Sequence, residues 1–246
     1  MDRLLYLAMT GASQNTMAIQ AHSNNLANIS TSGFRRDFEQ ARSMQTFGES
    51  YPSRVYSMSE RPGTDFTPGT LQETGRDLDV AIQGNGWIAV QGADGKEAYV
   101  RTSSLKVDAL GMLRTGNDLP VLGNGGPIAV PPNQQIEIGQ DGSITVRGAG
   151  ENTNALAVVD RIKLVKPDPK TLEKGLDGTI RTKDGKPAAA DASVQVVSGF
   201  TESSNVSAVE EMTSILSLSK QFELQIKMMK SAEDNDASMA KVLQFS

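Results

Sequence analysis

Hydrophobic and polar positions change their spacing twice along the chain. From residue 2 to about residue 30, apolar and small residues recur at steps of three and four, which predicts an amphipathic helix. From residue 206 to residue 244 the same spacing returns and approaches a heptad, which is typical of a coiled-coil seam. The first stripe consists of Leu4, Ala8, Ala12, Asn15, Ile19, His22, Leu26 and Ile29. The second consists of Met212, Ile215, Ser219, Phe222, Ile226, Met229, Ala232, Asp236, Met239 and Leu243.

Between these two segments, residues 76–200 contain short runs of Val, Ile and Leu that are separated by turn dipeptides, which predicts β-structure. Asn-Gly and Asp-Gly pairs favour tight hairpin turns, and six of them begin at residues 85, 94, 124, 141, 177 and 184. Strands are expected at residues 80–83, 87–91, 99–102, 128–130, 136–138, 144–146, 162–165 and 194–198.

Residues 35–75 show no sustained period, and several prolines and glycines interrupt them. A structureless loop of this length is unusual inside a compact domain. We therefore expect this segment to be an extended connector arm that is held against a neighbour.

The predicted fold class is α+β, with long N- and C-terminal helices that pair as a coiled-coil-like inner domain. At about 1.5 Å per residue these helices would span roughly 40 and 55 Å. A β-rich domain of about 125 residues has a radius of gyration of only ~14 Å, so it cannot cover both helices. The expected boundaries are 1–34 for the N-terminal helix, 35–75 for the connector, 76–203 for the inserted β-rich domain and 204–246 for the C-terminal helix.

Composition excludes several classes of function. The formal net charge of −5 argues against a nucleic-acid partner, because phosphate binding needs a clustered basic surface. The chain has no cysteine, which excludes disulfides and thiolate metal sites. No apolar run reaches the length of a membrane span. The apolar run at residues 4–9 is too short for a cleaved signal peptide, so any export is expected to use another route.

Two motifs invite a chemical interpretation that their context does not support. His22 is the only histidine, and nothing in its segment supplies the acid that a catalytic triad needs, so a packing or interface role is favoured. The sequence from Gly84 to Ala89 matches a dinucleotide fingerprint, with Asp108 about twenty residues further on. That fingerprint must open a helix, whereas the residues after Gly86 are β-branched and soon reach another turn. A hairpin with an Asn-Gly turn is favoured instead.

Three carboxylates could be imagined as a hydrolytic pair or a calcium site. They are Glu73, Asp77 and Asp79. Their spacing lacks the distal glutamate of a calcium loop, and the alternation at residues 77–80 predicts a strand with one solvent-facing side. We therefore predict no catalytic residue, no cofactor and no metal, although a carboxylate-dependent hydrolase stays open as an alternative.

The end of the first predicted helix has an unusual polar composition. The stretch "SNNLANISTSGF" (residues 23–34) contains three asparagines, and residues 4–34 contain no Asp, Glu, Lys or Arg. Amides both donate and accept hydrogen bonds, so a face of amides and small residues can be buried without desolvating an ion. We expect this helix to be surrounded by protein in the working state, and Gly33 to provide the left-handed position that ends it.

Three stretches resemble the flagellar axial proteins, which comprise rod, hook and hook-associated subunits. "NNLANISTSGFRRD" (24–37) is similar to their N-terminal signature, "ETGRDLDVAIQGNGWIAV" (73–90) to their core-domain motif, and residues 204–244 to their C-terminal helix. The resemblance covers the whole chain. The opening "MDRLLYLAMTGASQ" and the total length are most similar to the proximal rod subunits of that family.

The resemblance implies a structural, non-enzymatic subunit of the basal-body rod. Family members pack their terminal helices as the inner layer of a tube in the periplasm, pass through the flagellar type III export apparatus without a cleaved signal, and contact copies of themselves and neighbouring proximal and distal rod proteins. No nucleic acid and no direct membrane insertion are implied. The alternatives are another axial subunit, such as the distal rod protein, or a periplasmic or cell-surface β-domain that binds a ligand and is oligomerised by its helices.

The assembly interface is expected to use residues from both helices and from the turn after the first helix. These residues are Leu4, Ala8, Ala12, Ile19, His22, Asn24, Asn25, Leu26, Asn28, Ile29, Gly33, Phe34, Met212, Ile215, Phe222, Ile226 and Met229.

Overall fold

The computed structural model describes residues 2–45, 55–131, 133–148, 157–175 and 177–244. The chain forms two compact units. The first, which we call the helical unit, comprises Met1–Ile29, Arg36–Asp65 and Val206–Ser246. The second, which we call the β unit, comprises Ser30–Arg35 and Phe66–Asn205. The class is α+β, as the sequence predicted.

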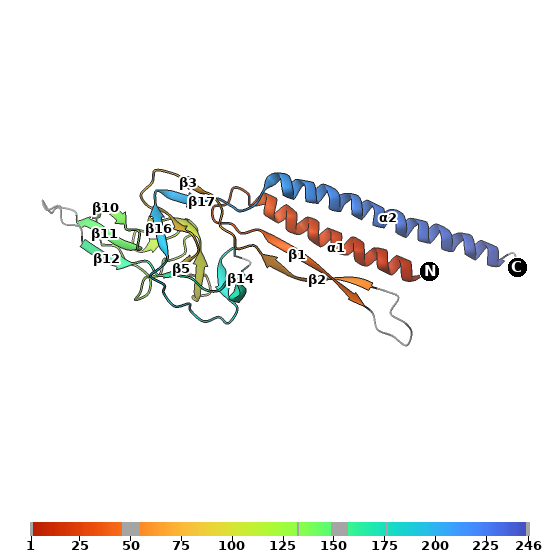
Figure 1. Cartoon of the computed structure of the whole chain (residues 1–246), viewed down its shortest axis with the longest axis horizontal. Coiled ribbons are helices and arrows are strands. Elements are labelled where there is room, and N and C mark those ends of the chain that lie inside the picture. The colour runs from red at the N-terminus through yellow and green to blue at the C-terminus, as the bar shows by residue number, and fades with distance from the viewer. Residues whose placement is uncertain (1, 46–54, 132, 149–156, 176, 245–246) are drawn as a thin grey trace. The chain divides into compact units, whose positions relative to one another are not determined.

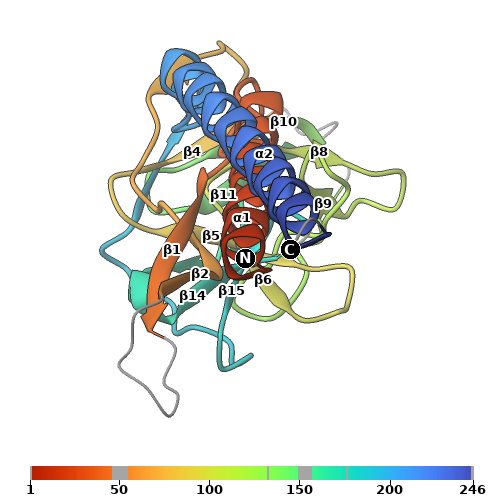
Figure 2. The ribbon, with the colours of Figure 1, turned by 90° about the vertical axis from the view of Figure 1, so that its right-hand side faces the viewer.

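The helical unit is built from two long helices and a two-stranded ribbon (Figure 1). Helix α1 (Asp2–Ala27) and helix α2 (Ala208–Gln244) lie side by side and run antiparallel, as the end-on view also shows (Figure 2). Strands β1 (Asp37–Gln45) and β2 (Val55–Thr64) pair antiparallel and contact α1. This ribbon lies within residues 35–75, for which the sequence predicted an extended connector arm. Paired strands were not expected there, because the apolar alternation of this segment is too weak to indicate them.

Small side chains let the two helices approach each other. Ala8 and Ala12 are buried on α1, and Ala232 is buried on α2. Helix α1 ends at Ala27, a few residues earlier than expected, and the amide N–H of Asn28 bonds the carbonyl of Asn24 in a last turn. Gly33 has the positive φ of +71° that was expected, but it lies in a turn beyond the helix rather than at its immediate end.

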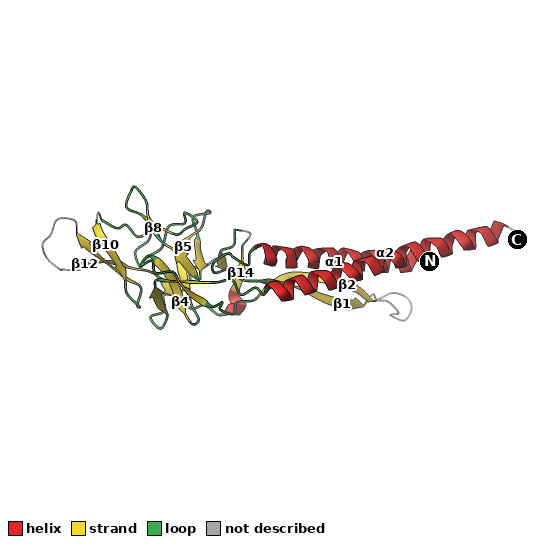
Figure 3. Cartoon of the chain, turned by 90° about the horizontal axis from the view of Figure 1, so that it is seen from above, coloured by secondary structure: helices red, strands yellow, loops and turns green. Residues whose placement is uncertain are grey.

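The β unit consists of short antiparallel strands arranged in several small sheets (Figure 3). A five-stranded sheet has the order β13-β5-β6-β15-β14, and two three-stranded sheets have the orders β16-β4-β7 and β10-β11-β12. Strands β17 and β3 form one further pair, and β8 and β9 another. The bounds are β3 Leu71–Glu73, β4 Asp79–Gln83, β5 Trp87–Gln91, β6 Glu97–Val100, β7 Thr102–Ser104, β8 Lys106–Val107, β9 Leu113–Arg114, β10 Asn133–Ile138, β11 Ser143–Gly148, β12 Ala157–Arg161, β13 Leu164–Val165, β14 Leu172–Lys174, β15 Ile180–Thr182, β16 Gln195–Ser198 and β17 Phe200–Glu202, with a 3-10 turn at Pro169–Thr171.

Two apolar clusters fill the β unit. The larger one gathers Val, Ile and Leu side chains from most of the sheets, including Ile82, Ile88 and Leu113. The smaller one surrounds Trp87 and Tyr99. The Tyr99 hydroxyl donates to Glu97 Oε1 at 2.9 Å and accepts from the amide N–H of Ala188 at 2.8 Å. Burial raises the pKa of Tyr99 to about 12, and the neighbouring carboxylate acts in the same direction.

Most predicted strands are confirmed, but two predicted hairpins are wrong. One is at Asp184-Gly185, which follows β15, because the next strand along the chain, β16, pairs with β4 and not with β15. Asp94-Gly95, Asp141-Gly142 and Asp177-Gly178 each lie between two strands that pair with each other. Asn85-Gly86 does not, because β4 pairs with β7 and β16 while β5 pairs with β6 and β13. The chain passes from one sheet to another there. Residues 128–130 form only an isolated bridge instead of a strand.

A second correction concerns the start of β4. The alternation at residues 77–80 predicted a strand with a solvent-facing side, but both Asp79 and Val80 are buried. Asp79 accepts a hydrogen bond from the Ser104 hydroxyl at 2.5 Å, so its carboxylate is satisfied inside the unit. A buried polar residue paired across strands cannot be distinguished from a solvated one by spacing alone.

Candidate assembly surface

The inner face of the helix pair follows the spacing that the sequence predicted. On α1, Ala8 and Ala12 are buried, and Ile19, His22 and Leu26 are half-buried. On α2, Ile215, Phe222 and Met229 from the predicted stripe are half-buried. Leu4 lies within α1, but its side chain is outside the described residues. The partly covered stripe shows that two helices alone do not bury these side chains completely.

Several large apolar side chains of both helices face solvent. Met212 and Ile226, two members of the predicted stripe, are 53% and 44% exposed. Met239, a further member of the predicted stripe, is 56% exposed. Positions outside the stripe are exposed as well: Leu5, Tyr6, Leu7, Met9 and Met17 on α1, and Val209, Leu216, Leu224 and Met228 on α2. Exposed groups of large apolar side chains mark interaction sites in soluble proteins. The sequence analysis followed one stripe and missed these positions, although helices with apolar residues on every side are typical of buried helices.

A polar cluster ties α1 to α2 and to the ribbon. Asn25 is only 1% exposed, and its side-chain amide donates to the Asp37 carbonyl and accepts from the Asp37 N–H, both at 2.9 Å. The same amide nitrogen lies 3.4 Å from Glu211 Oε2, and His22 Nδ1 donates to that oxygen at 2.5 Å. Asn25 thus acts as a further strand residue beside the start of β1. Its partners lie within its own chain.

The other asparagines have different surroundings. Asn24 is exposed, and Asn28 donates to the carbonyl and side-chain oxygens of Asn24 at 2.9 and 3.3 Å. These bonds satisfy acceptors at the last turn of α1, where helices leave carbonyls unpaired. Ile29 is half-buried beside them.

Two charged residues of the helical unit were missed by the sequence analysis. Glu211 is buried in the first turn of α2, where the helix dipole favours an acidic side chain. Arg36 contacts Asp65 at 3.0 Å and Glu210 at 3.3 Å. The acidic pair at the start of the predicted helix was the available signal for Glu211.

The turn after α1 contributes its residues to the β unit. Gly33 donates its N–H to the Glu202 carbonyl at 2.7 Å. The Lys174 ammonium lies 3.7 Å from the centre of the Phe34 ring and donates to the Arg35 carbonyl at 2.7 Å. Both predicted residues, Gly33 and Phe34, are therefore engaged within the chain.

A buried ionic cluster lies next to this turn. The Glu202 carboxylate pairs with Arg35 and, at 2.9 Å, with Arg101, and all three side chains are nearly inaccessible to solvent. Arg101 also donates to the carbonyls of Gly86 and Gly84 at 2.6 and 2.7 Å. The glycine segment that resembled a dinucleotide fingerprint therefore serves to hold an arginine.

The single tryptophan completes this cluster. The guanidinium carbons of Arg35 and Arg101 lie 5.9 and 5.5 Å from the centre of the Trp87 ring. Phe66 meets the same ring edge-on at 5.9 Å. Burial lowers the pKa of Arg101, and the Arg35 charge acts in the same direction against the attraction of Glu202. Two cations share one carboxylate here, and the electron-rich face of the Trp87 ring attracts both of them.

The structure also bears on the nucleotide-binding and metal-binding sites that the sequence suggested. Residues 87–91 form a strand, which removes the helix that a dinucleotide site requires. No group of three or more His, Asp or Glu side chains in the described ranges could hold a metal ion. Glu73 and Asp77 are exposed, whereas Asp79 is buried and its carboxylate accepts from the Ser104 hydroxyl. Over its described residues, neither helix is long and apolar enough to cross a membrane.

Known protein families match both the helical ends of the chain and part of the β unit. Three family models match the chain: "Flagella basal body rod protein" at residues 5–35, "Flagellar hook protein FlgE/F/G D1 domain" at 81–146 and "Flagellar basal body rod FlgEFG protein C-terminal" at 197–242. The flagellar basal-body rod protein FlgF of Escherichia coli is 40% identical over the full length of both chains. The chain belongs to the flagellar basal-body rod family, and it is FlgF-like.

Other members of the family support the FlgF-like assignment. FlgF of Salmonella typhimurium is 39% identical over the full length of both chains. The rod protein FlgG of Bacillus subtilis is 27% identical over 95% of this chain and 96% of its own. The matched segments at residues 5–35 and 197–242 include most of α1, the turn at Gly33 and most of α2. These regions carry the exposed apolar side chains of the two helices.

Proposed function

We propose that this chain is a structural subunit of the flagellar basal-body rod, of the FlgF type, and that it assembles through its two helices. The observation that carries the proposal is the set of large apolar side chains that α1 and α2 expose, such as Leu216 at 66%. Burying one such side chain contributes about 1.5–3 kcal/mol. Repeated over many subunits, this burial drives assembly.

The proposed partners are copies of this chain and the neighbouring proximal and distal rod proteins, in the periplasmic part of the basal body. A head-to-tail contact that does not close on itself produces a helical array. Within the array we expect α1 and α2 to pack against helices of adjacent subunits in a coiled-coil-like layer. The interface would include Leu4, the half-buried Ile19, Leu26, Ile215, Phe222 and Met229, and the exposed Met212 and Ile226, whereas Ala8 and Ala12 are buried within the chain.

The same arrangement suits torque transmission to the hook. Stiffness against twisting would come from many lateral helix contacts, since packed interfaces deform little. We further propose that the subunit travels through the flagellar type III export apparatus without a cleaved signal peptide. The proposed role needs no enzymatic activity.

The proposal is tested with a matched pair of substitutions on α2. Leu216→Asp places a charge on the proposed interface, whereas Ser217→Asp places the same charge on the adjacent exposed position. Both variants should retain the helical circular dichroism of the purified subunit, because both positions face solvent. Leu216→Asp should abolish motility and be absent from isolated basal bodies. Normal motility and normal incorporation of Leu216→Asp would contradict the proposal.

A further inference from the structure

The chain contains two Asn-Gly pairs, and the structure places them in different surroundings. Such a pair is reactive because glycine has no Cβ to hinder its backbone nitrogen. That nitrogen attacks the side-chain amide carbon of the preceding asparagine, ammonia leaves, and a succinimide ring forms. Water then opens the ring at either carbonyl and gives aspartate or isoaspartate, with no change in oxidation state. The reaction therefore needs a peptide bond that can rotate and access to water.

The Asn85-Gly86 pair is held on both sides. Arg101 donates from Nη1 to the Gly86 carbonyl at 2.6 Å and from Nη2 to the Gly84 carbonyl at 2.7 Å. Arg101 is itself buried. Gly86 is buried as well, and a Cβ at this position would lie only 2.5 Å from the Val194 side chain. Closing a ring at Asn85 would rotate a peptide bond between two fixed carbonyls, so the structure opposes the reaction there.

The Asn124-Gly125 pair lacks these restraints. Both residues are exposed and lie in a bend. The bond that closes the bend runs from the Gly123 N–H to the Gly126 carbonyl at 2.7 Å, so it leaves the peptide between Asn124 and Gly125 free. Within the described part of the chain, no hydrogen bond uses the Gly125 N–H, whose nitrogen is the attacking group. A Cβ at Gly125 would meet nothing within 4 Å, so this peptide bond has room to rotate.

We propose that Asn124 is a site of spontaneous deamidation in the folded chain, and that the bonds from Arg101 protect Asn85. Ring closure at Asn85 requires the loss of at least one hydrogen bond to a charged group. Such a loss slows a reaction step by at least about tenfold. The modification takes place within a single subunit, so it is independent of the proposed rod function.

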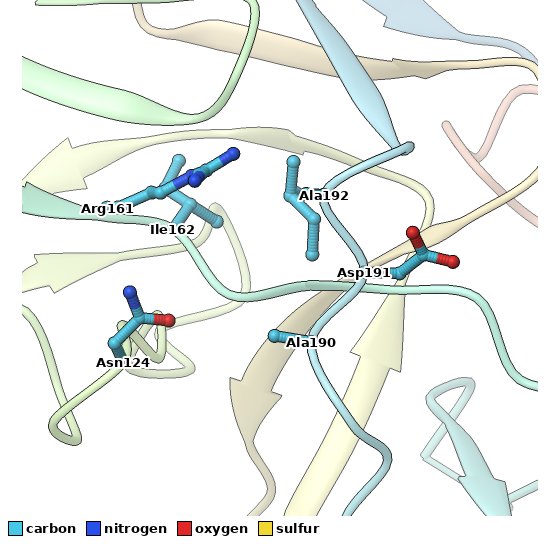
Figure 4. Close-up of a pocket in the computed structure, with 7 residues that line it drawn as sticks. Asn124, Arg161, Ile162, Ala190, Asp191 and Ala192 are labelled. Atoms are coloured by element: carbon cyan, nitrogen blue, oxygen red, sulfur yellow. The ribbon is translucent and has the colours of Figure 1, made fainter.

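Deamidation at Asn124 changes the charge of a depression in the surface of the β unit. Asn124, Arg161 and Asp191 all line this depression (Figure 4). Arg161 Nε donates to the Asp141 carbonyl at 2.7 Å, and Asp191 Oδ1 accepts from the Ser193 N–H at 2.8 Å. The product adds a second carboxylate beside one guanidinium, and isoaspartate also lengthens the backbone of the bend. The modification therefore makes this face of the β unit more negative.

Peptide mapping of the purified full-length chain tests the proposal. Trypsin separates the two pairs, because residues 77–96 contain Asn85 and residues 115–147 contain Asn124. The folded chain is incubated in a mildly alkaline buffer, and mass spectrometry with fragmentation then measures the replacement of NH₂ by OH at each asparagine. We expect the modified fraction to grow at least about tenfold faster at Asn124 than at Asn85. In denaturant, where Arg101 no longer holds the neighbouring carbonyls, the two rates should become similar.

Gly125→Ala is the matched control, because its Cβ fits the fold but hinders the attacking nitrogen. This variant should keep the thermal unfolding of the natural chain and should slow deamidation at Asn124 at least about tenfold. Hydroxylamine cleaves a chain at a succinimide and provides a second measurement. It should release fragments 1–124 and 125–246 from the folded natural chain, and much less of them from Gly125→Ala.

Three results would overturn the proposal. The first is an Asn124 that stays unmodified in the folded chain. The second is equal rates at Asn124 and Asn85 in the folded chain. The third is a tenfold difference that persists in denaturant, because the protection of Asn85 would then come from the local sequence and not from Arg101.

Discussion

The side chain of Asn25 and the backbone of Asp37 form two hydrogen bonds, each 2.9 Å long. Asn25 donates one and accepts the other, as a neighbouring strand residue would. An amide can do both, whereas a carboxylate has no donor and an ammonium has no acceptor. This geometry explains one of the three asparagines of the 23–34 stretch by a contact within the chain.

We predict that Asn25→Asp destabilises the helical unit by roughly 1–3 kcal/mol. The substitution keeps the shape of the side chain but removes the donor to the Asp37 carbonyl. It also places a negatively charged oxygen where the amide nitrogen now lies, 3.4 Å from Glu211 Oε2. Denaturant unfolding followed by far-UV circular dichroism measures the change, because both long helices belong to this unit. Asn24→Asp is the matched control at an exposed site and should change the stability little. Equal effects of the two variants would contradict the role given to Asn25.

A second prediction concerns the two arginines that share Glu202. Glu202→Gln removes the carboxylate that Arg35 and Arg101 share, so two buried cations lose this counter-charge. We expect a loss of about 3–5 kcal/mol in the unfolding free energy of the β unit. Arg35→Met should cost less, because Glu202 keeps its bonds to Arg101 and to the Gly69 N–H.

Tryptophan fluorescence measures both variants selectively, since Trp87 is the single tryptophan and lies against this cluster. The double variant Arg35→Met/Glu202→Gln completes a double-mutant cycle. Additive effects in that cycle would show that Arg35 and Glu202 are not coupled.

The sequence predicted the helices and most strands because period is a local property. The spacing of Ile215, Phe222 and Met229 placed α2 correctly, and dipeptides such as Asp94-Gly95 placed real hairpins. Contacts between residues that are far apart in the sequence produce no such local pattern. Arg35 and Glu202 are 167 positions apart, and nothing in the local pattern of either residue indicates the other. The Asn85-Gly86 hairpin was wrong for the same reason, because a turn dipeptide does not reveal which strands pair after it.

The helix residues that are buried within the chain were predictable only in part. Helical spacing identifies the stripe that faces the other helix, so it correctly selected Ala8 and Ala12 as buried. It does not indicate a second apolar face. Leu216 and Leu224 lie outside the stripe, and their exposure becomes apparent only once α1 is seen to cover a single side of α2.

A third prediction follows from four aspartates in turns of the β unit. Asp108, Asp141, Asp177 and Asp191 each accept the N–H of the residue two positions on. Their pKa values are lowered: by Arg114 at Asp108, by Ser143 at Asp141 and by Ser193 at Asp191. Burial opposes this at Asp177, but the bonds from Thr179 and Arg181 outweigh it.

A folded-state pKa below the unfolded value of about 3.9 means that the unfolded chain binds protons first as the pH falls. The stabilisation is therefore complete above that value and is lost as the pH falls through the folded-state pKa values. We expect the β unit to lose stability below about pH 4. Replacing all four aspartates by asparagine keeps the acceptor oxygens and should flatten this dependence in Trp87 fluorescence. An unchanged acid profile in the fourfold variant would assign the loss to other groups.

The last prediction contrasts two glycines. Gly11 lies inside α1, and a Cβ there would approach the amide end of the Gln225 side chain at 2.9 Å. That end can rotate away, and alanine is favoured over glycine in a helix by about 0.8–1.0 kcal/mol. We expect Gly11→Ala to leave the helical unit as stable or to stabilise it by up to about 1 kcal/mol, measured by thermal unfolding of the helical signal.

Gly33→Ala should have the opposite sign. Its φ of +71° costs an ordinary residue about 1–2 kcal/mol, and its Cβ would lie 2.9 Å from the Thr102 methyl group. The loss should be seen in the β unit through Trp87 fluorescence, because the Gly33 N–H bonds the carbonyl of Glu202 there. Stabilisation by both alanines would show that helix propensity extends past Ala27 and that the turn at Gly33 does not require its left-handed backbone. Opposite signs in the two units would establish that the 23–34 stretch ends one structure and begins the other.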